Sequence, residues 1–168
     1  MKKEKSAINK LCDPKSDVSS HYFVKENGII LNLIPDLYQA WHAGKSSWKK
    51  FRSLNKYSIG IEIHNSGHNK NYKNFSSNQI NSLIYLLKSL MKIYKKKYKN
   101  ILGHSDIAPY RKKDPGEKFP WKKLCNLDLS YCPKKVSFNE LEKIRIWSKK
   151  NKIYLNKNKI LIMLNFIG

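Results

Sequence analysis

The chain has 168 residues, of which 40% are hydrophobic and 27% charged, so it is long enough for one domain with a hydrophobic core and a small appendage. It carries 34 lysines and arginines against 12 acidic residues, a formal net charge of +22, but only Arg52, Arg111 and Arg145 are arginines. Proteins that read nucleic-acid bases rely on bidentate arginine contacts, so this lysine-dominated charge argues against a specific nucleic-acid partner, although a basic surface still attracts polyanions such as an anionic cell wall.

The hydrophobic pattern predicts neither a leader peptide nor a membrane span. Residues 1–17 are polar throughout, and no run approaches the ~20 apolar residues that a spanning helix needs. We therefore expect the chain as written to stay in the cytoplasm, or to reach the periplasm if a longer N-terminus exists, and we expect a monomer. The cysteines Cys12, Cys125 and Cys132 are odd in number and lack a close-spaced pair, which predicts buried or free thiols rather than a disulfide framework.

The first elements of the chain are predicted by local signals. Residues 6–12 favour a short helix that stops before Asp13-Pro14, because the residue before a proline disfavours helix. Two β-rich runs, 21–24 and 29–34, flank Asn27-Gly28, and Asn-Gly between such runs is the strongest local signal for a β-hairpin.

Three residues near this hairpin are candidates for a site. His21 lies on the first strand, where a packed, hydrogen-bonded core histidine is favoured over a metal ligand. Trp41 and His42 lie in the loop AWHAGKSSW (40–48), which suits contact with a sugar or a peptide. Burial of the aromatic rings explains that loop equally well.

Residues 57–64 (YSIGIEIH) alternate isoleucines with Gly60, Glu62 and His64, a period of two that predicts a β-strand. The isoleucines would face the core, and Glu62 and His64 would share the other face. We expect a central, buried strand, in which a carboxylate favours a functional role over a solvated side chain.

The most strongly patterned element follows. Ser76 and Gln79 form a candidate capping box before apolar residues that recur at helical spacing over 80–94, so we predict an amphipathic helix of about five turns. Further along, residues 137–150 predict another helix, and residues 160–167 an apolar strand or a helix end.

Residues 103–121 (GHSDIAPYRKKDPGEKFPW) combine a histidine and two aspartates with prolines and glycines. The prolines restrict the backbone and disfavour helix, so His104 and Asp114 are expected on an irregular but constrained segment. An imidazole and a carboxylate suit zinc, and a catalytic zinc usually takes three protein ligands. Taken alone, the two residues are better explained by turn hydrogen bonds and capping.

Four ordered segments together resemble the zinc-dependent N-acetylmuramoyl-L-alanine amidases, the type-2 family related to peptidoglycan recognition proteins. The segments are VSSHYFV (18–24), AWHAGKSSW (40–48), YSIGIEIHN (57–65) and GHSDIAPYRKKDPGEKFPW (103–121). The resemblance covers about residues 6–124. It implies an α/β fold with a mixed central β-sheet flanked by helices, a single amidase domain over 1–125 and a basic, partly helical tail over 126–168.

The resemblance also implies a reaction and roles for individual residues. His104 and Asp114 match two zinc ligands, Glu62 matches the acid that acts on the attacking water, and Lys112 matches the cation that faces the developing oxyanion. The expected reaction is zinc-dependent hydrolysis of the amide between N-acetylmuramic acid and L-alanine in peptidoglycan or muropeptides, as in cell-wall turnover. Expected substrate contacts are Trp41, His42, His64 and Asn65.

The chain departs from the family at its start. The family's first zinc ligand is a histidine on an N-terminal strand, whereas no residue before His21 is a histidine, so we expect the domain to lack its first strand, as in an N-terminally truncated product. A non-catalytic remnant that binds muropeptides or the cell wall is therefore the alternative to an active enzyme. His64 shares a strand face with Glu62 and is a candidate third ligand, although we expect it to contact substrate instead.

Overall fold

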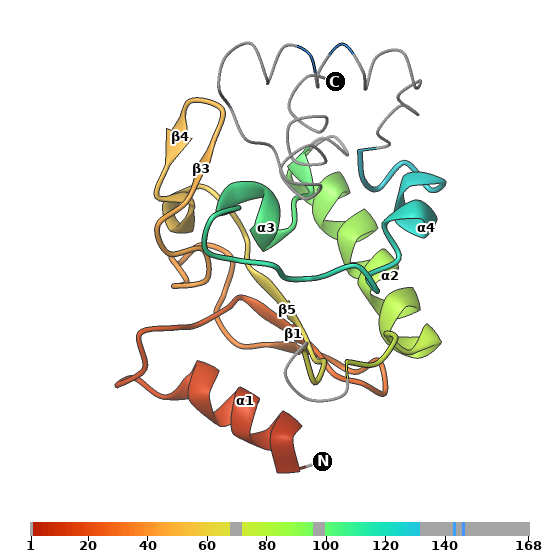
Figure 1. Ribbon diagram of the computed structural model, residues 1–168. Helices are drawn as coiled ribbons and strands as arrows, with labels where there is room; N and C mark the ends of the chain where they lie inside the picture. Colours follow the sequence, from red (N-terminus) through yellow and green to blue (C-terminus); the bar gives the residue numbers. More distant parts are fainter. Residues whose placement is uncertain (1, 68–71, 96–99, 132–142, 144–145, 147–168) are drawn as a thin grey trace. The chain divides into compact units, whose positions relative to one another are not determined.

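The computed structural model describes residues 2–67, 72–95 and 100–131, together with 143 and 146 (Figure 1). Contacts divide the chain into two units, Met1–Ser130 and Tyr131–Gly168. Of the helix predicted over 137–150, only Lys143 and Ile146 are described, and both are helical. The segment predicted over 160–167 lies outside the described residues, and all that follows concerns the first unit.

The described part of the chain holds a three-stranded mixed sheet with the strand order β2-β1-β5, of which Figure 1 labels β1 and β5. Its strands are β1 (Tyr22–Val24), β2 (Ile30–Asn32) and β5 (Ile61–Ile63). β1 pairs antiparallel with β2 and parallel with β5. The predicted hairpin is confirmed: Gly28 sits in the turn at a φ of 91°, in the left-handed region that glycine adopts without steric cost.

The prediction for residues 57–64 holds only in part. The strand spans Ile61–Ile63, and among the described residues it pairs with β1 alone, so it is an edge strand rather than a central one. Just before the strand, the Gly60 carbonyl accepts from the N–H groups of His21 and Tyr22, its own N–H donates to His21 Nδ1, and the His42 ring packs against it. Periodicity reports which side chains share a face, but it does not report how many neighbours a strand has.

Helix α2 (Ser77–Ile93) is the long helix expected from the helical spacing. Ser76 caps it by accepting from the Gln79 N–H at 3.1 Å, as a capping box requires. The Gln79 side chain does not complete the box, because its amide is buried and donates to the carbonyls of Val24 at 3.2 Å and His64 at 2.8 Å. The two strand carbonyls hold the Gln79 amide in the core, so its oxygen does not reach back to the Ser76 N–H as a capping box requires.

The core lies between the sheet and α2. Val24 of β1 packs there with apolar residues of α2 and of the segment that follows the candidate site loop. The fully buried members are Val24, Ile80, Leu83, Leu87, Phe119, Leu124 and Leu129. Because each buried side chain of this size stabilises the fold by about 1.5–3 kcal/mol relative to an exposed one, this cluster anchors the strands that carry the site.

Helix α1 (Lys2–Cys12) begins earlier than the 6–12 predicted and ends at the expected residue. Its extra turn is held to the hairpin, since Glu4 accepts from the Glu26 N–H at 3.0 Å and pairs with Lys25 at 3.4 Å. The end of the helix was predicted correctly because its signal, Asp13-Pro14, is local. The start was not, because the residues that bond to Glu4 lie more than twenty positions away in the sequence.

Several short elements had no clear sequence signal. They are the hairpin strands β3 (Ser47–Trp48) and β4 (Phe51–Arg52), the 3₁₀ turn Leu54–Lys56, α3 (His104–Ile107) and α4 (Trp121–Cys125). The β3–β4 turn lacks the Asn-Gly signature and instead places Lys49 at a φ of 51°.

The cysteine prediction is confirmed for Cys12, which is free, and is wrong for Cys125, which is disulfide-bonded. An odd cysteine count says nothing about which pairs the fold brings together. Within the described parts of the chain, no helix has both the length and the apolar character needed to cross a membrane.

Candidate active site

Glu62 projects from β5 on the face opposite Ile61 and Ile63, whose side chains pack against the core. It remains accessible to solvent, yet enough protein surrounds it that burial raises the pKa of its carboxyl. The Asp114 carboxylate raises this pKa further, whereas His104 and Lys112 lower it. Glu62 therefore lies within electrostatic reach of residues from the loop some forty positions later.

His104 and Asp114 meet directly. His104 Nδ1 lies 3.0 Å from Asp114 Oδ2, with the histidine side chain mostly buried and the aspartate side chain 58% exposed. Burial alone would raise the pKa of the Asp114 carboxyl, but the hydrogen bond and charge of His104, together with the Lys112 charge, outweigh it and hold that pKa below its usual range.

The backbone of the loop fixes both ends of this pair. His104 begins the short helix α3, and the Asp114 carbonyl accepts from the Ser105 N–H at 2.9 Å, which closes the loop between the two residues. Beyond Asp114, the Tyr72 hydroxyl donates to the Pro115 carbonyl at 2.8 Å. The pair is carried by a constrained segment, as the prolines predicted, but the segment is not irregular throughout, because His104 lies in the short helix α3.

Lys112 completes a group of four. It is half-buried, its N–H donates to the Ala108 carbonyl at 2.9 Å, and its charge acts on both Glu62 and Asp114. The structure thus brings Glu62, His104, Lys112 and Asp114 into one region. The roles given to them from the sequence remain predictions.

The metal-binding capacity of this region follows from its donors. An imidazole nitrogen and a carboxylate oxygen both suit zinc, and catalytic zinc sites usually use three protein ligands. In the parts of the chain that the structure describes, no three histidine, cysteine, aspartate or glutamate side chains are grouped closely enough to hold a metal ion. His104 and Asp114 lie together as a pair of suitable donors, and His64 does not form such a group with them.

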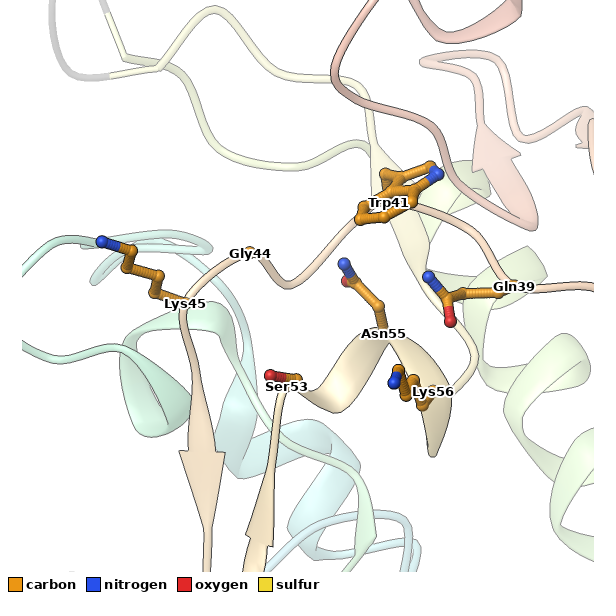
Figure 2. A pocket seen from close by; sticks show the side chains of 7 residues that line it. All are labelled: Gln39, Trp41, Gly44, Lys45, Ser53, Asn55 and Lys56. Carbon is orange, nitrogen blue, oxygen red and sulfur yellow. The ribbon is translucent and has the colours of Figure 1, made fainter.

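Trp41 lines a pocket of about 280 Å³ beside this region (Figure 2). The indole is 59% exposed, so burial does not explain its presence in the loop. The other lining residues are Gln39, Gly44, Lys45, Ser53, Asn55 and Lys56. An exposed indole next to amides and ammonium groups provides both a stacking surface and hydrogen-bond donors, as sugar and peptide ligands require.

His42 is placed differently from its neighbour Trp41. Its ring packs against Gly60, and its Nε2 lies 3.2 Å from the Ser58 carbonyl. Burial lowers the pKa of His42 to about 4. The charges of His21 and His104 lower this pKa further, whereas the hydrogen bond to Ser58 raises it. His42 is therefore neutral at pH 7 and supports the loop from inside.

Asn65 and His64, the other two predicted substrate contacts, both contact neighbouring parts of the protein. The Asn65 amide donates to the Lys73 carbonyl at 3.0 Å, and its oxygen accepts from the Gly67 N–H. The half-buried His64 ring lies 6.2 Å from the Phe23 ring, centroid to centroid. Whether either residue touches a substrate remains a prediction.

His21 is the core histidine that its strand position indicated. Its side chain is buried, Nδ1 accepts from the Gly60 N–H at 3.0 Å, and Nε2 lies 2.9 Å from the Tyr38 carbonyl. A backbone N–H can only donate and a carbonyl can only accept, so the neutral ring carries its proton on Nε2.

Three residues around the site were not picked out from the sequence. Tyr72 holds the loop after Asp114, Arg111 joins that loop to the segment after His42, and buried Asn55 organises that segment. Arg111 lies within the motif that drew attention to the loop, but no local signal marks Asn55 or Tyr72.

Comparison with known proteins identifies the family. The family described as N-acetylmuramoyl-L-alanine amidase matches residues 1–117, which is more than half of the chain. The chain belongs to the N-acetylmuramoyl-L-alanine amidase family. The resemblance of the four segments is thereby confirmed.

Curated relatives of this amidase-family chain match it over about two thirds of its length. The N-acetylmuramoyl-L-alanine amidase AmiD of Escherichia coli is 41% identical over 128 residues, covering 69% of this chain and 46% of AmiD. The 1,6-anhydro-N-acetylmuramyl-L-alanine amidase AmpD of Haemophilus influenzae is 39% identical over 107 residues, covering 63% of this chain and 56% of AmpD. The chain thus spans about half the length of the curated relatives it matches.

Solved structures confirm the expected fold class. AmiD from E. coli, in complex with the substrate anhydro-N-acetylmuramic acid-L-Ala-D-gamma-Glu-L-Lys, matches with a TM-score of 0.72 and 38% identity over 78% of this chain and 55% of that one. AmpDh3 from Pseudomonas aeruginosa matches with a TM-score of 0.73 and 28% identity over 96% of this chain and 67% of that one. The α/β amidase fold predicted from the sequence is therefore correct.

Proposed function

We propose that this chain hydrolyses the amide bond between the lactyl group of N-acetylmuramic acid and L-alanine in peptidoglycan or muropeptides, with zinc as its metal. The observation that supports this most directly is the convergence of Glu62, His104, Lys112 and Asp114, from two distant segments, in a chain of the amidase family. The substrate class follows that of two solved relatives, AmiD with an anhydromuramoyl tripeptide and AmpDh3 with an anhydromuramic pentapeptide.

Glu62 has the properties of the base and acid in this reaction. Its carboxylate would take a proton from the attacking water as the new C–O bond forms, and would give that proton to the leaving amine as the C–N bond breaks. A carboxyl whose pKa is raised, as that of Glu62 is, holds the proton between these two steps better than an ordinary one.

Lys112 would stabilise the charge that develops on the substrate, and the His104–Asp114 pair would hold the metal. The Lys112 ammonium, whose charge already acts on this region, would stabilise the negative oxygen that develops on the carbonyl. His104 Nδ1 and Asp114 Oδ2 would hold zinc, together with a third donor. When bound, zinc supplies a Lewis acid that polarises the carbonyl and lowers the pKa of water.

The experiment is a cleavage assay with the 168-residue chain, zinc and an anhydromuramoyl tripeptide, in which mass spectrometry follows the release of free tripeptide. Release that depends on zinc and is lost in Glu62→Gln supports the proposal. Binding of the muropeptide without release, both with and without zinc, would instead support the second candidate, a non-catalytic muropeptide-binding protein. That alternative is favoured by one observation, namely that the described residues supply only two of three metal donors.

A further inference from the structure

The peptide unit of Ala43 lies against the outer nitrogen of His104. The Ala43 carbonyl oxygen is 3.1 Å from His104 Nε2, the ring nitrogen that faces away from Asp114. The same oxygen accepts from Arg111 Nη2 at 2.8 Å. One carbonyl therefore lies within hydrogen-bonding distance of two side chains of the loop that carries the site, and it accepts from Arg111 whichever nitrogen of His104 carries the proton.

Asn55 holds this peptide unit from the other side. Its side-chain oxygen accepts from the backbone N–H of Ala43 at 2.7 Å and of His42 at 3.1 Å. Asn55 is buried and Ala43 is completely buried, so water is not available to replace either bond. Asn55 thus fixes the plane of the peptide whose carbonyl points at His104.

Arg111 ties the same segment to the site loop from outside. Besides the Ala43 carbonyl, its Nη2 donates to the Lys45 carbonyl at 3.1 Å. Gly44 between them adopts a φ of 57°, and a Cβ at that position would meet the guanidinium at 3.1 Å. The absence of a side chain at Gly44 lets the arginine approach the backbone this closely.

We propose that Asn55 and Arg111 are positioning residues, which act through the Ala43 carbonyl to orient the His104 ring so that Nδ1 faces Asp114. The inference rests on the proposed function for the role of His104, and extends it to two residues that act on His104 through the backbone of Ala43. A hydrogen bond from the second ring nitrogen fixes both the proton position and the orientation of a ligating histidine.

The contact between Arg111 and His104 defines the competing arrangement. Arg111 Nη2 lies 3.4 Å from His104 Nε2. If Nε2 carried no proton, it would accept from Arg111, and the Ala43 carbonyl would play no part in holding the ring. The inference therefore requires a proton on Nε2 of His104.

The test uses long-range ¹H–¹⁵N imidazole spectra of the full chain, which locate the proton on each histidine ring without any activity measurement. The spectra are recorded with zinc in excess, because without a metal the Asp114 carboxylate requires the proton of a neutral His104 ring on Nδ1, whereas a metal on Nδ1 would leave that proton on Nε2. Under these conditions we expect a protected Nε2–H on His104 in the unaltered chain. In Arg111→Gln and Asn55→Leu this proton should exchange roughly threefold to tenfold faster, the effect of weakening one hydrogen bond. Titration with zinc alone should show about 10- to 100-fold weaker binding in both variants.

Matched controls separate positioning from general damage. Arg52→Gln removes an arginine that bonds only carbonyls of its own hairpin, and Asn55→Asp keeps the acceptor oxygens, so both should retain the His104 signal. The Nε2–H signal of the buried His21 serves as a control for folding. If Asn55→Leu loses the His21 signal as well as the His104 signal, that variant is misfolded, and the inference is then judged from Arg111→Gln alone.

An Nε2 without a proton in the unaltered chain with excess zinc, or an unchanged His104 signal in Arg111→Gln under the same conditions, overturns the inference and leaves the proposed function standing. Absence of amidase activity with these spectra as expected would overturn only the proposed function.

Discussion

The contact between Gly60 and His42 allows a direct test of the packing beneath the site. In Gly60→Ala, the new Cβ would lie 2.3 Å from His42 Cγ and 2.6 Å from His42 Cβ, distances that real atoms do not tolerate. The His42 ring must move, and its hydrogen bond to the Ser58 carbonyl must lengthen or break. Adding about 1–3 kcal/mol for overpacking to about 0.5–1.5 kcal/mol for one hydrogen bond gives a destabilisation of about 1.5–4.5 kcal/mol.

A loss of this size is a large part of the ~5–15 kcal/mol that stabilises a typical domain, so urea denaturation followed by tryptophan fluorescence will resolve it. The double variant His42→Ala/Gly60→Ala provides the control, because removal of the ring makes room for the new methyl group. We expect it to be at least ~1 kcal/mol more stable than the sum of the two single variants predicts. A Gly60→Ala chain within ~0.5 kcal/mol of the unaltered chain, or additive single variants, would refute the packing argument.

The remaining predictions concern the site itself. Glu62→Gln should lower amidase turnover by about 10²–10⁴-fold, because the amide keeps the shape and loses the proton acceptor; unchanged turnover would mean that Glu62 is structural. Because the fold raises the pKa of Glu62, the protonated carboxyl favours the folded state at low pH, and this contribution to stability is lost as pH rises through the folded pKa. Glu62→Gln should therefore be more stable than the unaltered chain at pH 7 and should lose that advantage near pH 4. Thermal melts at the two pH values will measure the difference. With two donors described, His104 and Asp114, the purified chain should lose zinc on dialysis against a mild chelator; stoichiometric zinc that survives this treatment would contradict the prediction. Tyr72→Phe, which removes the donor to the Pro115 carbonyl, should cost about 1 kcal/mol in chemical denaturation, and no change would show that the loop does not need this bond.

The sequence predicted best those elements whose signals are local. The hairpin around Gly28 and the capped helix after Ser76 are both present, because turn chemistry and helical spacing act over a few residues. The edge position of β5 was not predictable in this way, since strand order depends on contacts between distant segments. Likewise, Gln79 left its capping box for the carbonyls of Val24 and His64, which only the folded chain brings near it.

The same division applies to the candidate site. Glu62 was found by its alternation with isoleucines, and His104 and Asp114 by their proline-rich loop together with the family resemblance. Nothing in the neighbourhood of Asn55 indicates that its side chain holds the backbone of Ala43, twelve residues earlier. Such supporting residues are recognised by hydrogen bonds across the fold, and a single sequence does not encode them as a pattern.

The Gln79 amide also links the start of helix α2 to the end of strand β5, which presents Glu62. The His64 N–H donates to the Val24 carbonyl at 2.9 Å, and the Gln79 amide donates to that carbonyl and to the carbonyl of His64, so the three residues form a closed triangle. Fraying of the first turn of α2 would therefore strip a donor from the ends of β1 and β5 at the same moment. The strand that presents Glu62 is short and lies at the edge of the described sheet, and this triangle ties its end to a seventeen-residue helix, so we expect the two to open together in hydrogen exchange.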